Sequence, residues 1–511
     1  MNVRTDRNSK YHLRGVWIST VINLDWPSRR SSLIADDAER VATQKTELLS
    51  RLDEAVNLRM NAVFFQVRPC SDAFYQSSIL PWSVYLSGTL GKGPGFDPLQ
   101  FVIEHAHRRN LELHAWFNPY RVSMDTSQRT VDQLSRVEPG QPASVYLNHP
   151  QWIRTAANRF VLDPGIPEAR AWIIQGVMEV ARKYAIDGIH FDDYFYYESS
   201  GSTLDDAQTF VRHGQGFSNK ADWRRDNTYQ LIKQLSAQLR AHDRAIKFGV
   251  SPAGVWRNKK DDPLGSDTRA GVPNYDMGFA DTRRWVQEEL IDYIAPQVYW
   301  SFDLAAARFD TVTQWWADVV EGKNVHLYIG QALYKVGVAS HSEPQWMEDN
   351  GVTQINRQLA WNVATEHIHG SVLFRHGFLR APQVLPAISR IREEVWKSHA
   401  LIPPMPWKGA CPPDSPVCVQ QVSTPAGIQI NWQDSCENPE GKTRYYALYR
   451  FYSGEAVDVR RADRLLTTVR RSQCPQTWTD TGQHASDCTY AVTALDRGHQ
   501  ESLASIARRT D

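Results

Sequence analysis

The sequence predicts an α/β protein, a closed (β/α)8 barrel followed by a small antiparallel β-sandwich. Three observations support this. Across residues 11–400, short apolar segments alternate with amphipathic helical segments, as expected of repeated βα units around a parallel sheet. The alternation occurs eight times, the number that closes a TIM barrel. After a proline-rich stretch, the hydrophobic period changes to two, which indicates half-buried antiparallel strands.

The barrel strands are predicted from apolar segments that end in polar or turn residues. They are 14–20, 61–68, 111–118, the segment ending at Phe191, 247–252, 291–300, 325–330 and 369–375. Helical spacing separates them at 36–58, 97–109, 164–184, 226–243, 282–289, 311–321 and 354–366, with a last helix ending near Trp396. A long insertion, 119–163, follows the third strand.

The C-terminal part is predicted to be a separate module. Residues 401–417 are rich in proline and read as a semi-rigid linker between the barrel, 11–400, and a β-domain, 418–511. The alternating segments 427–432, 445–450 and 488–495 resemble a fibronectin type III module.

The cysteines are unevenly distributed. Cys70 stands alone, whereas five others crowd the tail. Their irregular spacing, without paired histidines, favours disulfides over a zinc site and hence an oxidising compartment. The tail cysteines are Cys411, Cys418, Cys436, Cys474 and Cys488.

The composition excludes several classes of protein. The 511 residues include 57 Lys+Arg and 57 Asp+Glu, so no net field attracts nucleic acid or an anionic membrane. No apolar run approaches the ~20 residues of a membrane span, and residues 1–10 lack a signal-peptide core. The 18 Trp and 20 Tyr fit either a large core or flat surfaces for sugar rings.

The candidate catalytic residues follow the fourth strand. Strand alternation directs His190 and Asp192 into the barrel, and Asp193 away unless the strand has already turned into a loop. A lone Asp at this position would more commonly cap a loop or helix. The doublet beside an aromatic cluster favours a site, because barrel chemistry sits at the C-terminal ends of the strands. Glycoside hydrolysis needs a second carboxyl group. Asp193 and Glu198 are the nearest choices, with more distant ones on other rim loops, namely Asp25, Asp72 and Asp303.

The same alternation predicts which side chains line the barrel mouth. Each has a structural explanation by itself, but polar and aromatic residues at several strand ends together indicate a carbohydrate pocket. The set is Gln66, Arg68, His114, Trp116, Asn118, Ser251, Gln297 and Tyr299, with Arg375 or Phe374 from the eighth strand. Phosphate-loop, metalloprotease and nucleophile-elbow motifs are absent from the sequence, so we expect no metal and no cofactor.

Several motifs resemble those of the bacterial glycosyl-hydrolase-like family ten. They are LRGVWI (13–18), LDWP (24–27), FQVRP (65–69), HAWFNPYR (114–121), FVLDPGIP (160–167), DGIHFDDYF (187–195), GVSPAGVWR (249–257) and YIAPQVYW (293–300). The motifs add five residues to the expected binding set, Trp17, Tyr120, Arg121, Tyr194 and Trp300.

The resemblance implies hydrolysis of peptidoglycan glycan strands without stem peptides, in cell-wall remodelling at division. It also implies a periplasmic location, a lipid anchor on the outer membrane in the full precursor, and possible partners in the division machinery. Two differences stand out. The chain shows no lipoprotein leader, and shorter relatives lack the C-terminal module.

Two alternatives stay open at this stage. The DGIHFDDYF motif also resembles the chitinase signature, but His190 replaces an Asp and Tyr194 stands in place of the catalytic Glu. A barrel that binds glycan at the septum without cutting it is therefore one alternative. The other is a hydrolase of a different polysaccharide, chitin-like or α-linked.

Overall fold

The computed structural model describes residues 10–197, 203–409, 411–436, 438, 441–472, 476–482 and 487–510. The chain forms two compact units. One comprises Gly15–Asn57 and Ala62–Arg390, and the other comprises Leu58–Asn61, Ile391–Asp511 and the N-terminal residues up to Arg14. Within the described residues, no helix has both the length and the apolar character needed to cross a membrane.

Eight strands close the barrel of the first unit, and each lies beside its neighbours in the chain. Their recorded pairings are parallel. This confirms the predicted (β/α)8 class. The strands are β1 (Leu13–Ile18), β2 (Ala62–Arg68), β3 (Glu112–Phe117), β6 (Gly188–Phe191), β7 (Lys247–Val250), β8 (Tyr293–Ile294), β9 (His326–Ala332) and β10 (Ile368–Phe374). The sixth segment was expected to be longer, over 291–300, but only Tyr293–Ile294 is strand.

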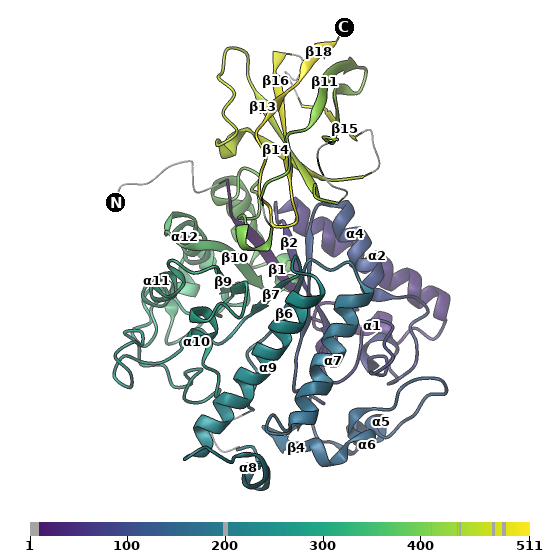
Figure 1. Ribbon diagram of the computed structural model, residues 1–511, viewed down its shortest axis with the longest axis vertical. Coiled ribbons are helices and arrows are strands. Elements are labelled where there is room, and N and C mark those ends of the chain that lie inside the picture. Colours follow the sequence, from purple (N-terminus) through teal and green to yellow (C-terminus); the bar gives the residue numbers. More distant parts are fainter. Residues whose placement is uncertain are drawn as a thin grey trace. The chain divides into compact units, whose positions relative to one another are not determined.

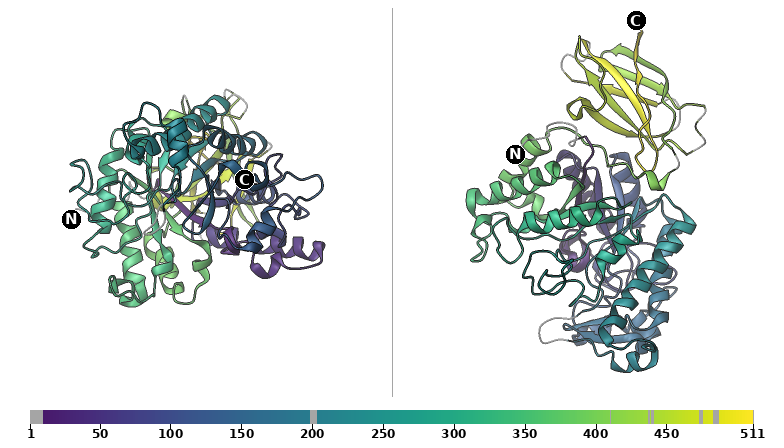
Figure 2. Two further views of the ribbon diagram at one scale, coloured as in Figure 1. Left: turned by 90° about the horizontal axis from the view of Figure 1, so that it is seen from below. Right: turned by 60° about the vertical axis from the view of Figure 1, so that its left-hand side comes forward.

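Helices surround the strands (Figure 1; Figure 2, left). The longer ones are α2 (Asp37–Asn57), α4 (Pro98–Arg108), α7 (Pro167–Lys183), α9 (Lys220–His242), α11 (Phe309–Val320) and α12 (Val352–Ala364), with the shorter α10 (Thr282–Gln287) and α13 (Leu385–Arg390). Helix α4 begins as predicted, with Asp97 accepting from the Gln100 amide ahead of Pro98. Helix α9 begins six residues before the predicted start, because Asn219 caps it by accepting from the amide of Asp222.

Two insertions extend one end of the barrel. The segment after β3 contains α5 (Gln128–Leu134), α6 (Val145–Asn148) and a hairpin of β4 (Ile153–Ala156) and β5 (Arg159–Leu162). Helix α8 (Ala207–His213) follows β6. Figure 1 shows α5, α6, β4 and α8 at the same end of the barrel. Since these segments follow strands, they mark the C-terminal rim, where barrel enzymes carry their sites.

A chain of polar groups crosses the barrel interior. Trp17 Nε1 donates to His190 Nε2 at 3.0 Å, so that nitrogen carries no proton and Nδ1 is the donor to the Tyr293 hydroxyl at 3.1 Å. The same hydroxyl lies 2.9 Å from His114 Nδ1. His114 Nε2 is 3.1 Å from Glu112, which pairs with Lys247 at 2.6 Å. Each buried polar group in this chain therefore has a partner, as burial requires.

Two glycines make room for this chain. A Cβ on Gly249 would lie 2.1 Å from the Tyr293 ring, and one on Gly188 would lie 2.5 Å from His114 Nδ1. Both glycines occupy inward positions of their strands, so larger residues there would displace the buried rings.

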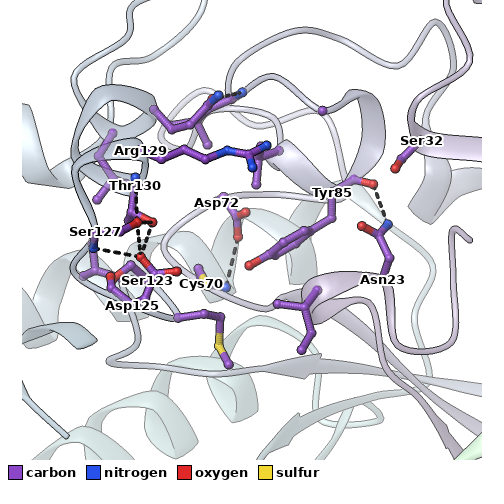
Figure 3. A pocket seen from close by; sticks show the side chains of 18 of the residues that line it. Asn23, Ser32, Cys70, Asp72, Tyr85, Ser123, Asp125, Ser127, Arg129 and Thr130 are labelled. Carbon is purple, nitrogen blue, oxygen red and sulfur yellow. Dashed lines mark hydrogen bonds between the residues drawn. The ribbon is translucent and has the colours of Figure 1, made fainter. Parts of the chain in front are cut away.

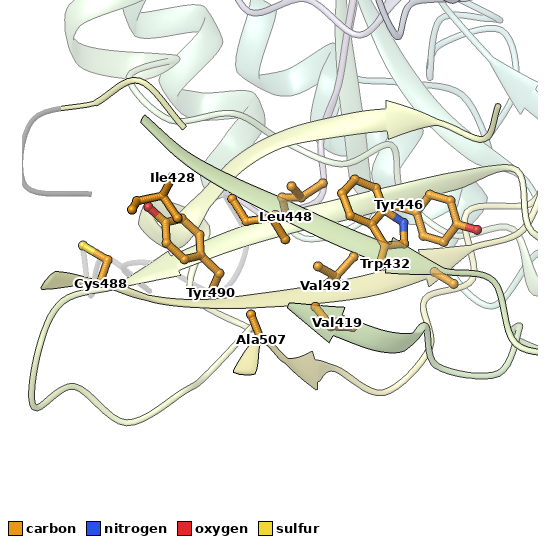
Figure 4. Packing of buried hydrophobic residues seen from close by; sticks show 11 residues of the cluster. Val419, Ile428, Trp432, Tyr446, Leu448, Cys488, Tyr490, Val492 and Ala507 are labelled. Atoms are coloured by element: carbon orange, nitrogen blue, oxygen red, sulfur yellow. The ribbon is translucent and has the colours of Figure 1, made fainter. Parts of the chain in front are cut away.

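The second unit contains two four-stranded sheets, of order β15-β12-β11-β18 and β14-β13-β16-β17. Most recorded pairs are antiparallel, as predicted, but β11 pairs with β18 in parallel. The strands are β11 (Val417–Thr424), β12 (Gly427–Gln433), β13 (Tyr445–Phe451), β14 (Leu465–Arg470), β15 (Gln476–Asp480), β16 (Thr489–Leu495), β17 (Ser505–Ile506) and β18 (Arg508–Thr510). Their core includes Trp432, Tyr446 and Tyr490 (Figure 4).

The start of the expected linker and four of the five tail cysteines lie within the described residues. Leu401 packs with Tyr445 and Tyr449 in a buried cluster of the second unit, so the start of the proline-rich stretch is a packed segment. Cys411, Cys418 and Cys436 are exposed and no disulfide links them to one another. Cys474 lies outside the described residues.

The glycine requirement gives a test of the barrel interior. We expect Gly249→Ala to reduce the free energy of unfolding by about 1–3 kcal/mol, because the added methyl overpacks the Tyr293 ring. Gly271→Ala is the matched control, since its Cβ meets nothing within 4 Å. Thermal and denaturant unfolding of both variants would measure the difference, and equal stabilities would contradict this explanation.

Candidate active site

Asp192 lies at the centre of the rim, held by a relay of amide side chains. Continuing the strand register places Asn118, after β3, and Ser251, after β7, beside it. Asn118 Nδ2 donates to Asp192 Oδ2, and Gln66 Nε2 donates to Asn118 Oδ1 at 2.6 Å. Gln66 Oε1 accepts from the backbone amides of Thr20 and Val21, each at 2.8 Å. This relay fixes which end of the Asn118 amide faces the carboxyl group.

The protonation of Asp192 is set by burial and by its neighbour. The side chain is 5% exposed. Burial first, and then the negative charge of Asp193, raise the pKa of Asp192 to about 8, against the opposing effect of Arg121. Burial also raises the pKa of Asp193, opposed by a hydrogen bond from Gln297 and by Arg121. The pair therefore retains a proton at neutral pH, the state that a general acid requires.

Asp193 joins the site because the strand ends early. Strand β6 stops at Phe191, so alternation no longer governs Asp193, and it interacts with Gln297 and Arg121 on the rim. Gln297 also donates to the Ser251 carbonyl at 3.0 Å. The sequence predicts that Asp193 faces away from the barrel interior unless the strand has already turned into a loop. The strand has ended before Asp193, so the exception applies.

Arg121 is the cation of the site. Its Nε donates to the Pro69 carbonyl at 2.6 Å, and its charge acts on both Asp192 and Asp193. It is 4% exposed, so its charge is little screened by solvent.

Aromatic rings and unsatisfied polar atoms complete the mouth. Tyr194 is 40% exposed and stacks on Tyr197 with ring centroids 5.2 Å apart. Tyr299 is half-buried and close enough that the charge of Asp193, after burial, raises its pKa. Among the described residues, the buried polar atoms without a hydrogen-bond partner include Trp116 Nε1, Tyr197 Oη and Ser251 Oγ, which lie near these strand ends. Such atoms are available to a ligand or to water.

Trp17 and His114, expected at the mouth, lie in the barrel interior. Their hydrogen-bonding nitrogens are occupied by the chain through His190 and Tyr293, and they are 2% and 0% exposed. The inward direction predicted for His114 by alternation is correct, but both residues lie deeper in the barrel than Asp192. Gln66 orients Asn118 through a hydrogen bond and is itself buried behind it.

Arg68 and Tyr120 point away from the carboxyl pair. A β-bulge between Gln66 and Arg68 aligns Arg68 with Phe117, an outward position. Its guanidinium therefore lies 5.0 Å from the ring of Trp172 on α7. Tyr120 is fully buried among Asp163 and Arg170, behind the rim. The expected role of these two residues in substrate binding stays a prediction.

The remaining expected residues have other positions. Trp300 is half-buried and packs on Gly254. Asp25 pairs with Arg375 at 2.5 Å and accepts from the Ser19 amide, which gives it a structural role. Asp303 is exposed. Glu198 lies outside the described residues, so its candidacy as the second carboxylate stays a prediction.

A cavity of about 450 Å³ lies among the segments that follow β1, β2 and β3, and neither residue of the carboxyl pair lines it. It is lined by the segments after β1 and β2 and by α5, including Asn23, Cys70, Asp72, Tyr85 and Arg129 (Figure 3). The Cys70 thiol contacts Arg121, so Arg121 lies between the cavity wall and Asp192. Strand alternation did not indicate this cavity, because the insertion after β3 forms one of its walls. Tyr197 was also missed, and its only signal was the tyrosine run after the doublet.

No group of three or more His, Cys, Asp or Glu side chains suited to a metal ion occurs among the described residues. A (β/α)8 barrel with a buried, proton-retaining carboxyl pair and exposed rings at its C-terminal rim has the parts of a glycoside hydrolase.

The comparisons with known proteins agree with that class. Residues 12–348 match the family described as Glycosyl hydrolase-like 10, and the chain belongs to this family of glycoside hydrolases. It is 49% identical over 394 residues to Glycosyl hydrolase DigH of Escherichia coli (strain K12), covering 77% of this chain and 89% of that protein.

A second relative extends over both units. The chain is 41% identical over 508 residues to Glycosyl hydrolase YngK of Bacillus subtilis (strain 168), covering 99% of this chain and 94% of that protein. Among solved structures, the glycoside hydrolase domain of PgaB (BpsB) from Bordetella bronchiseptica aligns with a TM-score of 0.44 at 12% identity, over 74% of this chain and 98% of that one.

The raised pKa of Asp192 predicts how stability depends on pH. Its folded value, about 8, lies above an unfolded value near ~3.9, so the folded state binds the proton more tightly. The free energy of unfolding therefore falls as pH rises from about 4 to about 8. Asp192→Asn removes this titration, so we expect its midpoint temperature to exceed the wild-type value at pH 8 and to match it near pH 4.5.

Thermal unfolding at both pH values measures this effect. Asp303→Asn, at an exposed position, is the control and should show no such difference. A shift of the same size at both pH values for Asp192→Asn would contradict the assigned burial of the charge.

Proposed function

We propose that this glycoside hydrolase cleaves peptidoglycan glycan strands that lack stem peptides, with Asp192 as the proton donor. The supporting observation is the buried pair in which Asp193 helps to raise the pKa of Asp192 to about 8. A carboxyl group that stays protonated at neutral pH next to a second carboxyl group is the arrangement that glycoside hydrolysis needs.

Each part of the site has a role in this reaction. Asp192 donates its proton to the glycosidic oxygen as the bond to the sugar breaks, and Asn118 holds the carboxyl group in position. A water molecule adds its oxygen to the anomeric carbon, and the proton that it loses restores the acid form of Asp192. Asp193, held by Gln297 and Arg121, is the second carboxyl group and stabilises the positive charge that develops on the sugar ring. Arg121 then stabilises Asp192 once it has become a carboxylate. Tyr194 and Tyr299 supply faces on which sugar rings stack.

The substrate and the location are proposed from the resemblance to the family. They comprise denuded glycan strands, cell-wall remodelling at division, an exported protein with a lipid anchor on the outer membrane, and possible contacts with the division machinery. The β-domain is proposed as a spacer or stabiliser of the barrel, with wall or partner binding as a second role.

The direct test uses glycan strands stripped by an amidase, with the products identified by mass spectrometry. We expect wild-type protein to release soluble oligosaccharides, and Asp192→Asn to reduce kcat by at least about 10²-fold, the lower end of what a general acid contributes. Asp303→Asn should retain full activity. Near-full activity of Asp192→Asn would refute the assignment.

Other outcomes separate the alternatives. Strands that co-sediment with wild-type protein but yield no new reducing ends would indicate a binding protein. Cleavage of chitin or an α-linked polysaccharide, with denuded strands left intact, would show that the protein is a glycoside hydrolase of a different substrate.

The pH profile gives an independent test. Asp192 donates a proton only while it is protonated, below a pKa of about 8, so kcat/KM should fall tenfold per pH unit above that value. Initial rates between pH 5 and 10 would show the descending limb. A profile that stays flat to pH 10 would exclude Asp192 as the acid.

A further inference from the structure

We propose that this cavity, whose wall residue Cys70 contacts Arg121, binds an anionic substituent of the glycan, a carboxylate on the sugar, through Arg29 and Arg129. This inference rests on the proposed function. It identifies the chemical group by which the protein would distinguish denuded strands from chitin and from peptide-bearing strands. Amidase action on peptidoglycan leaves a free lactyl carboxylate on every second sugar, whereas chitin carries none and a peptide-bearing strand has a neutral amide there.

The first support is that two arginines line the cavity. Arg29 comes from α1 (Arg29–Ser32) and Arg129 from α5. Figure 3 shows the side chain of Arg129 pointing into the cavity. Neither side chain forms an ion pair or a hydrogen bond with another described residue. Both side chains are exposed, so their guanidinium groups are accessible to a ligand, and a guanidinium fork is suited to holding a carboxylate.

The second support is that the acids of the same cavity compensate only part of the arginine charge. Hydrogen bonds from Ser127 and Thr130, and then the charge of Arg129, lower the pKa of Asp125, so Asp125 is ionised and offsets one positive charge. Asp125 Oδ1 accepts from the Ser127 amide at 2.9 Å and from the Ser127 hydroxyl at 2.7 Å. Asp72 is 3% exposed, accepts from the Cys70 amide at 3.0 Å, and has a pKa raised by burial. Burial likewise raises the pKa of Cys70 to about 12, which keeps the thiol neutral. The positive charge of the arginines is therefore only partly compensated.

The third support is the position and size of the cavity. Its wall residue Cys70 contacts Arg121, whose charge acts on Asp192. A sugar substituent in the cavity would thus belong to a strand whose glycosidic bond lies near the carboxyl pair. The volume of about 450 Å³ is within the range of small-molecule sites, and is enough for one substituted sugar ring.

The test compares denuded strands with the same strands after conversion of the lactyl carboxylates to methylamides. We expect wild-type KM to be about tenfold lower on the carboxylated strands, the factor expected for a charge-assisted hydrogen bond. Arg29→Gln and Arg129→Gln should each raise KM on the carboxylated strands severalfold. They should leave kcat, and KM on the methylamides, within about twofold. Higher salt should reduce the preference, because the arginines are exposed.

Arg30→Gln is the matched control. Arg30 neighbours Arg29 on α1 and is exposed, but it does not line the cavity. It should retain the wild-type preference. The proposal would be overturned if Arg29→Gln and Arg129→Gln raised KM equally on both substrates, or if neither variant raised KM.

A binding measurement tests the anion site separately from the proposed cleavage of denuded strands. Calorimetry with the Asp192→Asn protein compares a disaccharide containing muramic acid with its methylamide. Tighter binding of the carboxylate that is lost in Arg29→Gln and Arg129→Gln supports the anion site even if wild-type protein cleaves no denuded strand. Equal binding of both disaccharides refutes it, whatever the enzyme cleaves.

Discussion

The hydrogen bond from Asn118 to Asp192 is the contact on which the site depends. It ties together the ends of four strands, β6, β3, β2 and β1, because Asn118 is oriented by Gln66, and Gln66 in turn is held by the backbone after β1. A buried carboxyl group in such a setting keeps its proton, since ionisation would place an uncompensated charge beside Asp193. The same desolvation that destabilises the ionised protein thus creates the acid that the reaction uses.

The barrel supports this site with a satisfied polar interior. The chain from Trp17 through His190, Tyr293 and His114 to Glu112 and Lys247 fills the space below the carboxyl pair. Each interior ring has a fixed hydrogen-bond role, and Gly188 and Gly249 leave the space that those rings occupy. A rigid layer of this kind holds the residues at the strand ends within the small tolerances that catalysis demands.

The insertion after β3 adds selectivity to this chemistry. It brings Arg129 to the cavity that Cys70 and Arg121 separate from Asp192. Catalytic groups thus come from the strand ends, and the features that distinguish substrates come from the added segments. This division is usual in barrels, where loops vary on a constant frame.

The sequence by itself determined the eight-strand order and the inward direction of His190, Asp192 and Asn118, because alternation along a strand is a local property. Only the tertiary structure decided the rest. The bulge before Arg68 turned that side chain outward, burial depth removed Trp17 and His114 from the mouth, and the early end of β6 brought Asp193 to the rim. The raised pKa of Asp192 is likewise tertiary, since it arises from desolvation by residues distant in sequence and cannot be read from a local pattern.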